Sequence, residues 1–178
     1  STECNFSYNS FAAENKWLAH GDFDPALLDR LLRSRRSCRN YTKKSVSVEI
    51  LNDLVNFGIS APSGTNSQQW TFTLLSTREQ VIKLGSQVAI YFTGLNKKAA
   101  NPALRFISKL FYRDLLGKYY RNHYNSIQNG LHQWYMHKKD TLFHGAAAIV
   151  IIGSKQGASC PIEDALMASQ NILLGAHS

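Results

Sequence analysis

Apolar and polar residues alternate at helical spacing early in the chain. The first apolar stripe consists of Leu27, Leu28, Leu31 and Leu32. Asp24 and Pro25 precede it, and they combine a good N-cap with a residue suited to the first helical position. The pattern therefore predicts a helix that begins at Pro25 and ends at an arginine cluster.

Three further patterns follow between residues 47 and 80. Ser47 can cap a second helix, in which apolar residues repeat at helical spacing from Ile50 to Val55 and which ends near Gly58. Residues 70–74 alternate between apolar and polar types, which predicts a strand. Thr77 with Gln80 three residues later resembles a capping box for a short helix.

The second half of the chain predicts two more helices and a strand. Asn101 before Pro102 opens a helix, and residues 111–139 are then crowded with aromatic and basic side chains. Residues 146–152 are continuously apolar, which predicts a fully buried strand. A last helix begins at Cys160 and Pro161, with carboxylates in its first turn that interact favourably with the helix dipole. These carboxylates are Glu163 and Asp164.

The length of 178 residues fits one domain. Residues 1–22 lack a clear period and are predicted to form an arm or tail, whereas residues 23–178 form the domain. No apolar run approaches the ~20 residues that span a bilayer, and the first residues do not resemble a secretory signal. We therefore expect a soluble, cytoplasmic protein without a membrane partner.

The chain is basic, with 20 Lys and Arg against 12 Asp and Glu and a net charge of +8. This surplus attracts anions such as a flavin phosphate, a nicotinamide dinucleotide or nucleic acid, and charge alone does not choose among them. The three cysteines, Cys4, Cys38 and Cys160, are widely spaced and form no Cys-x-x-Cys pair, so neither a disulfide framework nor a zinc or iron-sulfur site is indicated.

The first candidate site is the arginine cluster at residues 35–39. Arg35, Arg36 and Arg39 place three guanidinium groups around Ser37. Guanidinium groups bind phosphate through a planar fork, so the cluster predicts a site for an anionic tail. Two other interpretations are a solvated helix end, whose charges complement the carbonyls of the last turn, and a nucleic-acid patch.

The second candidate site is the polar bend between the second helix and the first strand. Pro62, Ser63, Gly64 and Asn66 occupy it, and they are also residue types that favour ordinary turns. On residue types alone the ordinary turn is favoured, although such a loop also suits a flat polar heterocycle, and Gly64 is expected to supply conformational freedom. A flavin contact of Pro62, Ser63 and Asn66 is what the resemblance of this run and the following strand to a known family implies. Trp70 is assigned to the core.

The two segments together suit flavin mononucleotide (FMN), which has a phosphate at one end and a polar ring at the other. Other chemistries find less support. The six histidines show no metal-ligand spacing. The chain lacks the Gly-x-Ser-x-Gly elbow of serine hydrolases, and it also lacks the Rossmann and Walker glycine loops. No metal site is predicted.

These motifs resemble those of the nitroreductase family. The matching runs are Arg-Arg-Ser-x-Arg-x-Tyr from Arg35 and Ala-Pro-Ser-x-x-Asn-x-Gln-x-Trp from Ala61. Weaker likeness follows at residues 143–152 and 163–174. The resemblance implies an α+β fold with a central mixed or antiparallel sheet flanked by helices, and an intertwined homodimer with FMN at the interface. It also implies that the arginine cluster of one subunit and the bend of the other hold one flavin.

The resemblance implies an oxidoreductase that passes hydride from NADH or NADPH through FMN to a small acceptor such as a nitroaromatic, a quinone or an enone. No side chain is nominated as catalytic, and no nucleic-acid partner is expected. The variable region 95–140 would cover the flavin as a lid. Relatives usually continue beyond the last helix, where further basic residues complete the phosphate site. Two alternatives stay open: a basic nucleic-acid-binding domain without cofactor, and a truncated flavin fold without turnover.

Overall fold

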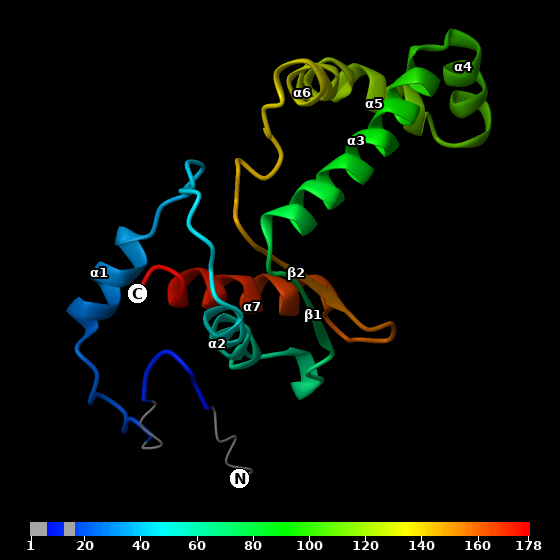
Figure 1. Cartoon of the computed structure of the whole chain (residues 1–178). Coiled ribbons are helices and arrows are strands. Elements are labelled where there is room, and N and C mark those ends of the chain that lie inside the picture. Colours follow the sequence, from blue (N-terminus) through cyan, green and yellow to red (C-terminus); the bar gives the residue numbers. More distant parts are fainter. Residues whose placement is uncertain (1–6, 13–16) are drawn as a thin grey trace. The chain divides into compact units, whose positions relative to one another are not determined.

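The computed structural model describes residues 7–12 and 17–178, which fall into two compact units. The first contains the chain up to Cys38 together with Lys44–Ser76 and Ala148–Ser178, and we call it the sheet unit. The second contains Arg39–Lys43 and Thr77–Ala147, and we call it the helical unit. The chain therefore leaves the sheet unit after the first strand and returns to it for the second (Figure 1).

In its described residues, the sheet unit has three α-helices, two strands and a short 3₁₀ turn. These elements are α1 (Pro25–Ser34), α2 (Val48–Ile59), the turn Gly64–Asn66, β1 (Trp70–Leu75), β2 (Ile149–Ser154) and α7 (Pro161–Gly175). The predicted caps are confirmed at α1 and α2. The Asp24 carboxylate accepts a 2.8 Å hydrogen bond from the Ala26 N–H, and the Ser47 hydroxyl accepts one from Ile50.

The two strands pair antiparallel, with Trp70 opposite Ser154 and Leu75 opposite Ile149. Trp70 and Phe72 lie on the face that packs against Ala61 and the α7 residue Ala168. The structure thus has helices and a small antiparallel sheet, and in the described residues this sheet has two strands.

The prediction of a fully buried strand over residues 146–152 was wrong. The strand begins at Ile149, and the side of the sheet away from the core leaves Ile151 41% exposed. An apolar run alone cannot distinguish a strand that is covered on both faces from one whose second face is open within a single chain.

The helical unit consists of α3 (Arg78–Ala100), α4 (Pro102–Phe111), α5 (Leu115–Asn122) and α6 (Tyr124–His137). The capping box of Thr77 and Gln80 is confirmed, but the helix that it opens runs for 23 residues and is not short. Tight packing joins α3 to α6, because a Cβ atom on Gly85 would lie 2.6 Å from the Trp134 ring.

The N-terminal segment around Ser10 docks on α2, and a buried carboxylate accepts four of its hydrogen bonds. Asp53 is 2% exposed. Its two oxygens accept hydrogen bonds of 2.6 to 3.0 Å from the backbone N–H groups and the side chains of Asn9 and Ser10. The Tyr8 ring lies 5.1 Å from the Phe57 ring on the same helix. The Asn56 side-chain amide also donates a 2.9 Å bond to the Ser7 carbonyl, so a segment without periodicity is held by a buried anion, an amide and aromatic contacts.

This contact predicts a pH-dependent contribution to stability. Burial of the Asp53 carboxyl would raise its pKa, but hydrogen bonds from Ser10 and Asn9 outweigh that effect and lower the pKa overall. The contribution is present above the unfolded-state pKa of about 3.9 and is lost as the pH falls through the lower folded-state pKa. We expect Asp53→Asn to lower the urea midpoint at pH 7, and the difference from wild type to shrink below about pH 3.9.

The matched control is Asp22→Asn, because the Asp22 side chain is exposed. It should leave the urea midpoint unchanged at both pH values. An equal loss of stability in both variants would show that general charge, and not the docked segment, is responsible.

Candidate functional site

The polar bend after α2 is an unusual stretch of backbone. Thr65, Asn66 and Gln68 all have positive φ angles between 48° and 55°. Such conformations are unfavourable for residues other than glycine, and they persist where surrounding contacts fix them. Within the bend, the Ser63 hydroxyl accepts a 3.0 Å bond from the Gln68 N–H, and the Ser63 carbonyl accepts one from Asn66.

A buried carboxylate on α7 anchors this bend. Asp164 is 4% exposed. One of its oxygens accepts a 2.8 Å bond from the Gly64 N–H, and the other lies 3.4 Å from the Ser67 hydroxyl. Its backbone carbonyl accepts a 3.1 Å bond from the Trp70 indole N–H. One residue of α7 thus holds both the middle of the bend and the first residue of β1.

The role expected for Gly64 requires a correction. Positive φ angles occur at its neighbours, whereas Gly64 is absent from the glycines with positive φ in the described chain. A Cβ atom at Gly64 would lie 2.8 Å from the Cys160 sulfur and 2.9 Å from the Ser159 hydroxyl oxygen. Glycine is therefore required by close contact with the start of α7 and not by conformational freedom.

The remaining bend residues are accessible. Pro62 and Asn66 are exposed and Ser63 is half-buried. The Asn66 side-chain oxygen accepts a 3.2 Å bond from the Gln68 amide. The bend therefore presents the Asn66 amide and the Ser63 hydroxyl on a backbone that Asp164 holds in place.

The arginine cluster follows the C-terminal end of α1. Arg35 caps the helix, and the Arg36 guanidinium donates hydrogen bonds to the carbonyls of Arg33 and Arg35. Arg36 thus makes the contacts of a solvated helix end, one of the interpretations left open by the sequence. Ser37 and Arg39 are exposed, and Arg39 belongs to the stretch grouped with the helical unit.

Within the sheet unit, the structure brings Pro62, Ser63, Gly64 and Asn66 together in one turn. Residues 35–37 do not lie at that turn. Figure 1 shows the end of α1 and the bend that precedes β1 on opposite sides of α2.

Sequence reasoning missed two supporting residues. Asp164 was expected only to interact with the helix dipole, and Ser159, whose hydroxyl donates a 2.9 Å bond to the Gly64 carbonyl, was not considered. Neither contact has a local signal, because about a hundred residues separate each pair. Asp164 lies in the first turn of α7, and its contact with the bend can be recognised only once the fold shows that this turn lies beside Gly64. Within the described chain, no group of His, Cys, Asp and Glu side chains is placed to hold a metal ion.

Comparison with protein families matches residues 32–178 to the Nitroreductase family. The chain belongs to this family. A search among curated proteins found no match.

Solved structures share the fold. A nitroreductase from Bacteroides fragilis with bound FMN superposes with a TM-score of 0.51 at 19% identity, over 84% of this chain and 64% of that one. An FMN-dependent nitroreductase from Clostridium difficile gives 0.51 at 24% identity, over 86% and 56%. An iodotyrosine deiodinase bound to FMN and 3-iodo-L-tyrosine gives 0.50 at 20% identity, over 84% and 68%. The chain thus spans less than two thirds of the first two proteins.

The Asp164 anchor generates a stability prediction. Asp164→Ala leaves the Gly64 N–H without its acceptor, which should lower the free energy of unfolding by about 1–3 kcal/mol. The control is Glu163→Gln in the same helical turn, where the side chain is exposed. It should change stability by less than about 0.5 kcal/mol. Chemical denaturation measures both, and equal effects would contradict the anchor.

Close packing at Gly64 predicts opposite signs for two identical substitutions. Gly64→Ala forces its methyl group against Cys160 and should destabilise the fold by about 1–3 kcal/mol. Gly94→Ala, in the middle of α3, meets no atom within 4 Å and should stabilise by about 0.5–1 kcal/mol because alanine favours helix. Thermal melting of both variants checks the pair, and a harmless Gly64→Ala would contradict the close contact.

Proposed function

We propose that this protein is an FMN-dependent oxidoreductase that transfers hydride from NADH or NADPH to a small oxidised acceptor. The observation that carries the proposal is the bend at Ser63 to Asn66, which a buried carboxylate fixes in a strained conformation within a chain of the nitroreductase family. Strain of this kind gathers at ligand sites, where a preformed backbone orients the bound group.

The phosphate end of FMN is assigned to the arginine cluster. Arg35, Arg36 and Arg39 supply cationic forks and Ser37 supplies a hydroxyl, a donor set suited to a dianionic phosphate. The Arg36 guanidinium already donates to two carbonyls of the helix end, so binding by Arg36 would require this side chain to turn. Arg35, Ser37 and Arg39 are therefore the stronger candidates.

The ring end is assigned to the bend. The flavin would contact Pro62, Ser63 and Asn66, and the backbone at Gly64 would keep these residues in position. The Gly64 N–H donates to Asp164, so its contribution is to hold the bend in place. The exposed Asn66 amide is the donor and acceptor best placed to recognise a polar ring edge.

The flavin supplies the chemistry of hydride transfer, as cofactors do generally. The residues of this chain bind it, orient it and place hydrogen-bond donors where negative charge gathers. No side-chain acid, base or nucleophile is assigned to the reaction. A nitroaromatic, a quinone or an enone is the proposed acceptor, and the region 95–140, which includes α4 to α6, is the proposed lid.

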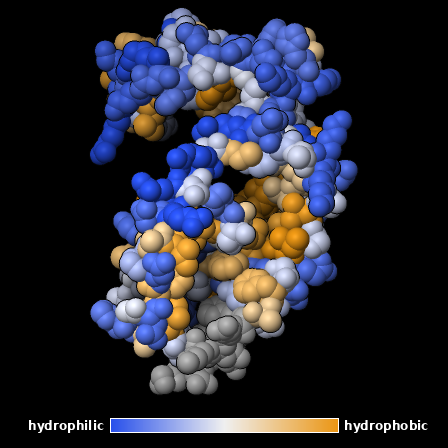
Figure 2. Space-filling model, turned by 90° about the vertical axis from the view of Figure 1, so that its left-hand side faces the viewer, coloured by the Kyte–Doolittle hydropathy of each residue, from blue (hydrophilic) through white to orange (hydrophobic). Residues whose placement is uncertain are grey.

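A homodimer is part of the proposal, because two apolar surfaces are open in one chain. Helix α1 has no buried residue and exposes Leu27, Leu28 and Leu32, and α7 exposes Leu166 and Leu173. Bands of apolar residues are visible over this part of the molecule in Figure 2. A second copy that covers these surfaces could also bring its arginine cluster to the bend of the first, which the single chain does not do.

The phosphate assignment is tested by comparing FMN with riboflavin, which lacks the phosphate. Arg35→Ala and Arg39→Ala should weaken FMN binding about tenfold or more and leave riboflavin binding unchanged, because each removes a charged hydrogen bond to phosphate. Flavin fluorescence titration of the full chain measures both ligands.

The control is Arg33→Ala, in the last turn of α1, because the Arg33 side chain is 77% exposed and forms an ion pair with Asp29. It should bind FMN as the wild type does. Undiminished FMN binding by Arg35→Ala and Arg39→Ala would refute the assignment. A colourless protein that binds no FMN but binds DNA or RNA in a salt-sensitive way would favour the nucleic-acid alternative.

A further inference from the structure

Helix α4 is amphipathic, but it is packed with its polar side inward. Ser108 is 6% exposed, and its hydroxyl accepts a 3.0 Å bond from the Leu116 N–H. The Arg105 guanidinium donates to the Ala99 carbonyl at 2.5 Å and lies 4.1 Å from the centre of the Tyr120 ring. The side of α4 that contacts α3 and α5 is therefore the polar one.

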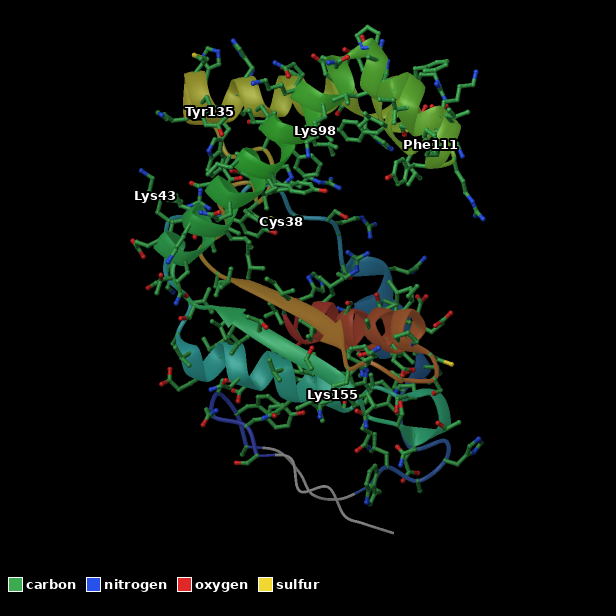
Figure 3. The ribbon with its side chains drawn as sticks, turned by 90° about the vertical axis from the view of Figure 1, so that its right-hand side faces the viewer. Cys38, Lys43, Lys98, Phe111, Tyr135 and Lys155 are labelled. Carbon is green, nitrogen blue, oxygen red and sulfur yellow. The ribbon has the colours of Figure 1, made fainter. Side chains whose placement is uncertain are left out.

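The opposite side of α4 is apolar and open. It exposes Phe106 by 69%, Leu110 by 67% and Phe111 by 71%, with Ile107 at 45%. Tyr112 and Leu115 extend this surface toward α5, exposed by 63% and 64%. Phe111 lies at one end of the helical unit in Figure 3. A helix that faces inward with its polar side and outward with its apolar side has the arrangement of an interfacial helix.

The surroundings of this surface are positively charged. Residues 77–147 contain eleven Lys and Arg against three Asp and Glu, whereas the rest of the chain contains nine of each. This stretch between the two strands therefore carries the whole surplus of positive charge. Two of its three carboxylates are in ion pairs, Asp114 with Arg121 and Asp140 with Arg78. Lys109, Arg113 and Lys118 are exposed beside the apolar surface.

We propose that the outer face of α4, with the start of α5, docks on the surface of an anionic lipid bilayer. Aromatic and leucine side chains would enter the headgroup boundary, and the flanking lysines and arginines would interact with anionic lipids. Pairing of two α4 faces between copies of this chain is disfavoured, because it would bring Lys109 and Arg113 of each copy against the same positive charges.

Docking on a bilayer surface differs from spanning a bilayer. Length and hydropathy test only for spanning segments, and no helix in the described ranges is long and apolar enough to cross a bilayer. The expectation that the protein has no membrane partner rested on that criterion. Surface docking depends instead on which side of a short helix faces outward, and only the structure gives that.

Vesicle co-sedimentation of the full chain tests the proposal. We expect the protein to bind phosphatidylcholine vesicles that contain about 30% phosphatidylserine, to bind pure phosphatidylcholine vesicles far less, and to dissociate as salt is raised. Leu110→Ser should reduce the bound fraction by at least about fivefold. The control is Ile90→Ser, an equally sized side chain on α3 that is 60% exposed, and it should bind as the wild type does.

The charged residues are tested separately with the double variant Lys109→Gln and Arg113→Gln, which should lose binding to anionic vesicles, against Lys83→Gln, which should not. Circular dichroism confirms that each variant is folded. Equal binding by Leu110→Ser and Ile90→Ser, or no binding of the wild type to anionic vesicles, would overturn the proposal. A change from dimer to monomer in Leu110→Ser without lipid, seen by sedimentation velocity, would assign the face to a second copy and overturn it as well.

Discussion

The candidate site depends on the hydrogen bond between the Asp164 carboxylate and the Gly64 N–H. Three residues of the bend adopt left-handed backbone conformations, each unfavourable by about 1–3 kcal/mol outside a context that enforces it. Without the anchor, the bend would relax to less strained turns, and the positions of Ser63 and Asn66 would no longer be fixed. The Asp164 carboxylate is buried and both of its oxygens contact the bend, so breaking either contact would leave a buried charge less well satisfied.

The sequence could predict where elements begin, because those signals are local. Asp24, Ser47, Thr77 and Asn101 each cap a helix within three residues of the backbone groups that they satisfy. The length of α3 was not predictable in the same way, since a capping box marks a beginning and carries no information about an end. The open face of β2 was also out of reach, because residue hydrophobicity does not tell whether a partner covers a strand.

The same distinction between local and long-range signals applies to the candidate site. The bend residues were identified from their types and spacing together with the family resemblance, and the structure does place them in one turn. What holds the turn was not identified, because Gly64 and Asp164 are a hundred residues apart and their contact exists only after α7 packs beside α2. The role of Gly64 was misjudged for the same reason: turn preferences are local, whereas its contact with Cys160 is not.

Helix α7 makes hydrogen bonds to the entry, the middle and the exit of the bend. Asn171 donates to the Ser60 hydroxyl at the entry to the bend, Asp164 holds Gly64 in its middle, and the Asp164 carbonyl holds Trp70 at its exit. The same helix exposes apolar residues on its other side, among them Leu166 and Leu173. A second copy packed on α7 would therefore press on the helix that fixes the bend. In the proposed dimer, subunit contact and flavin binding would stabilise each other through this one helix.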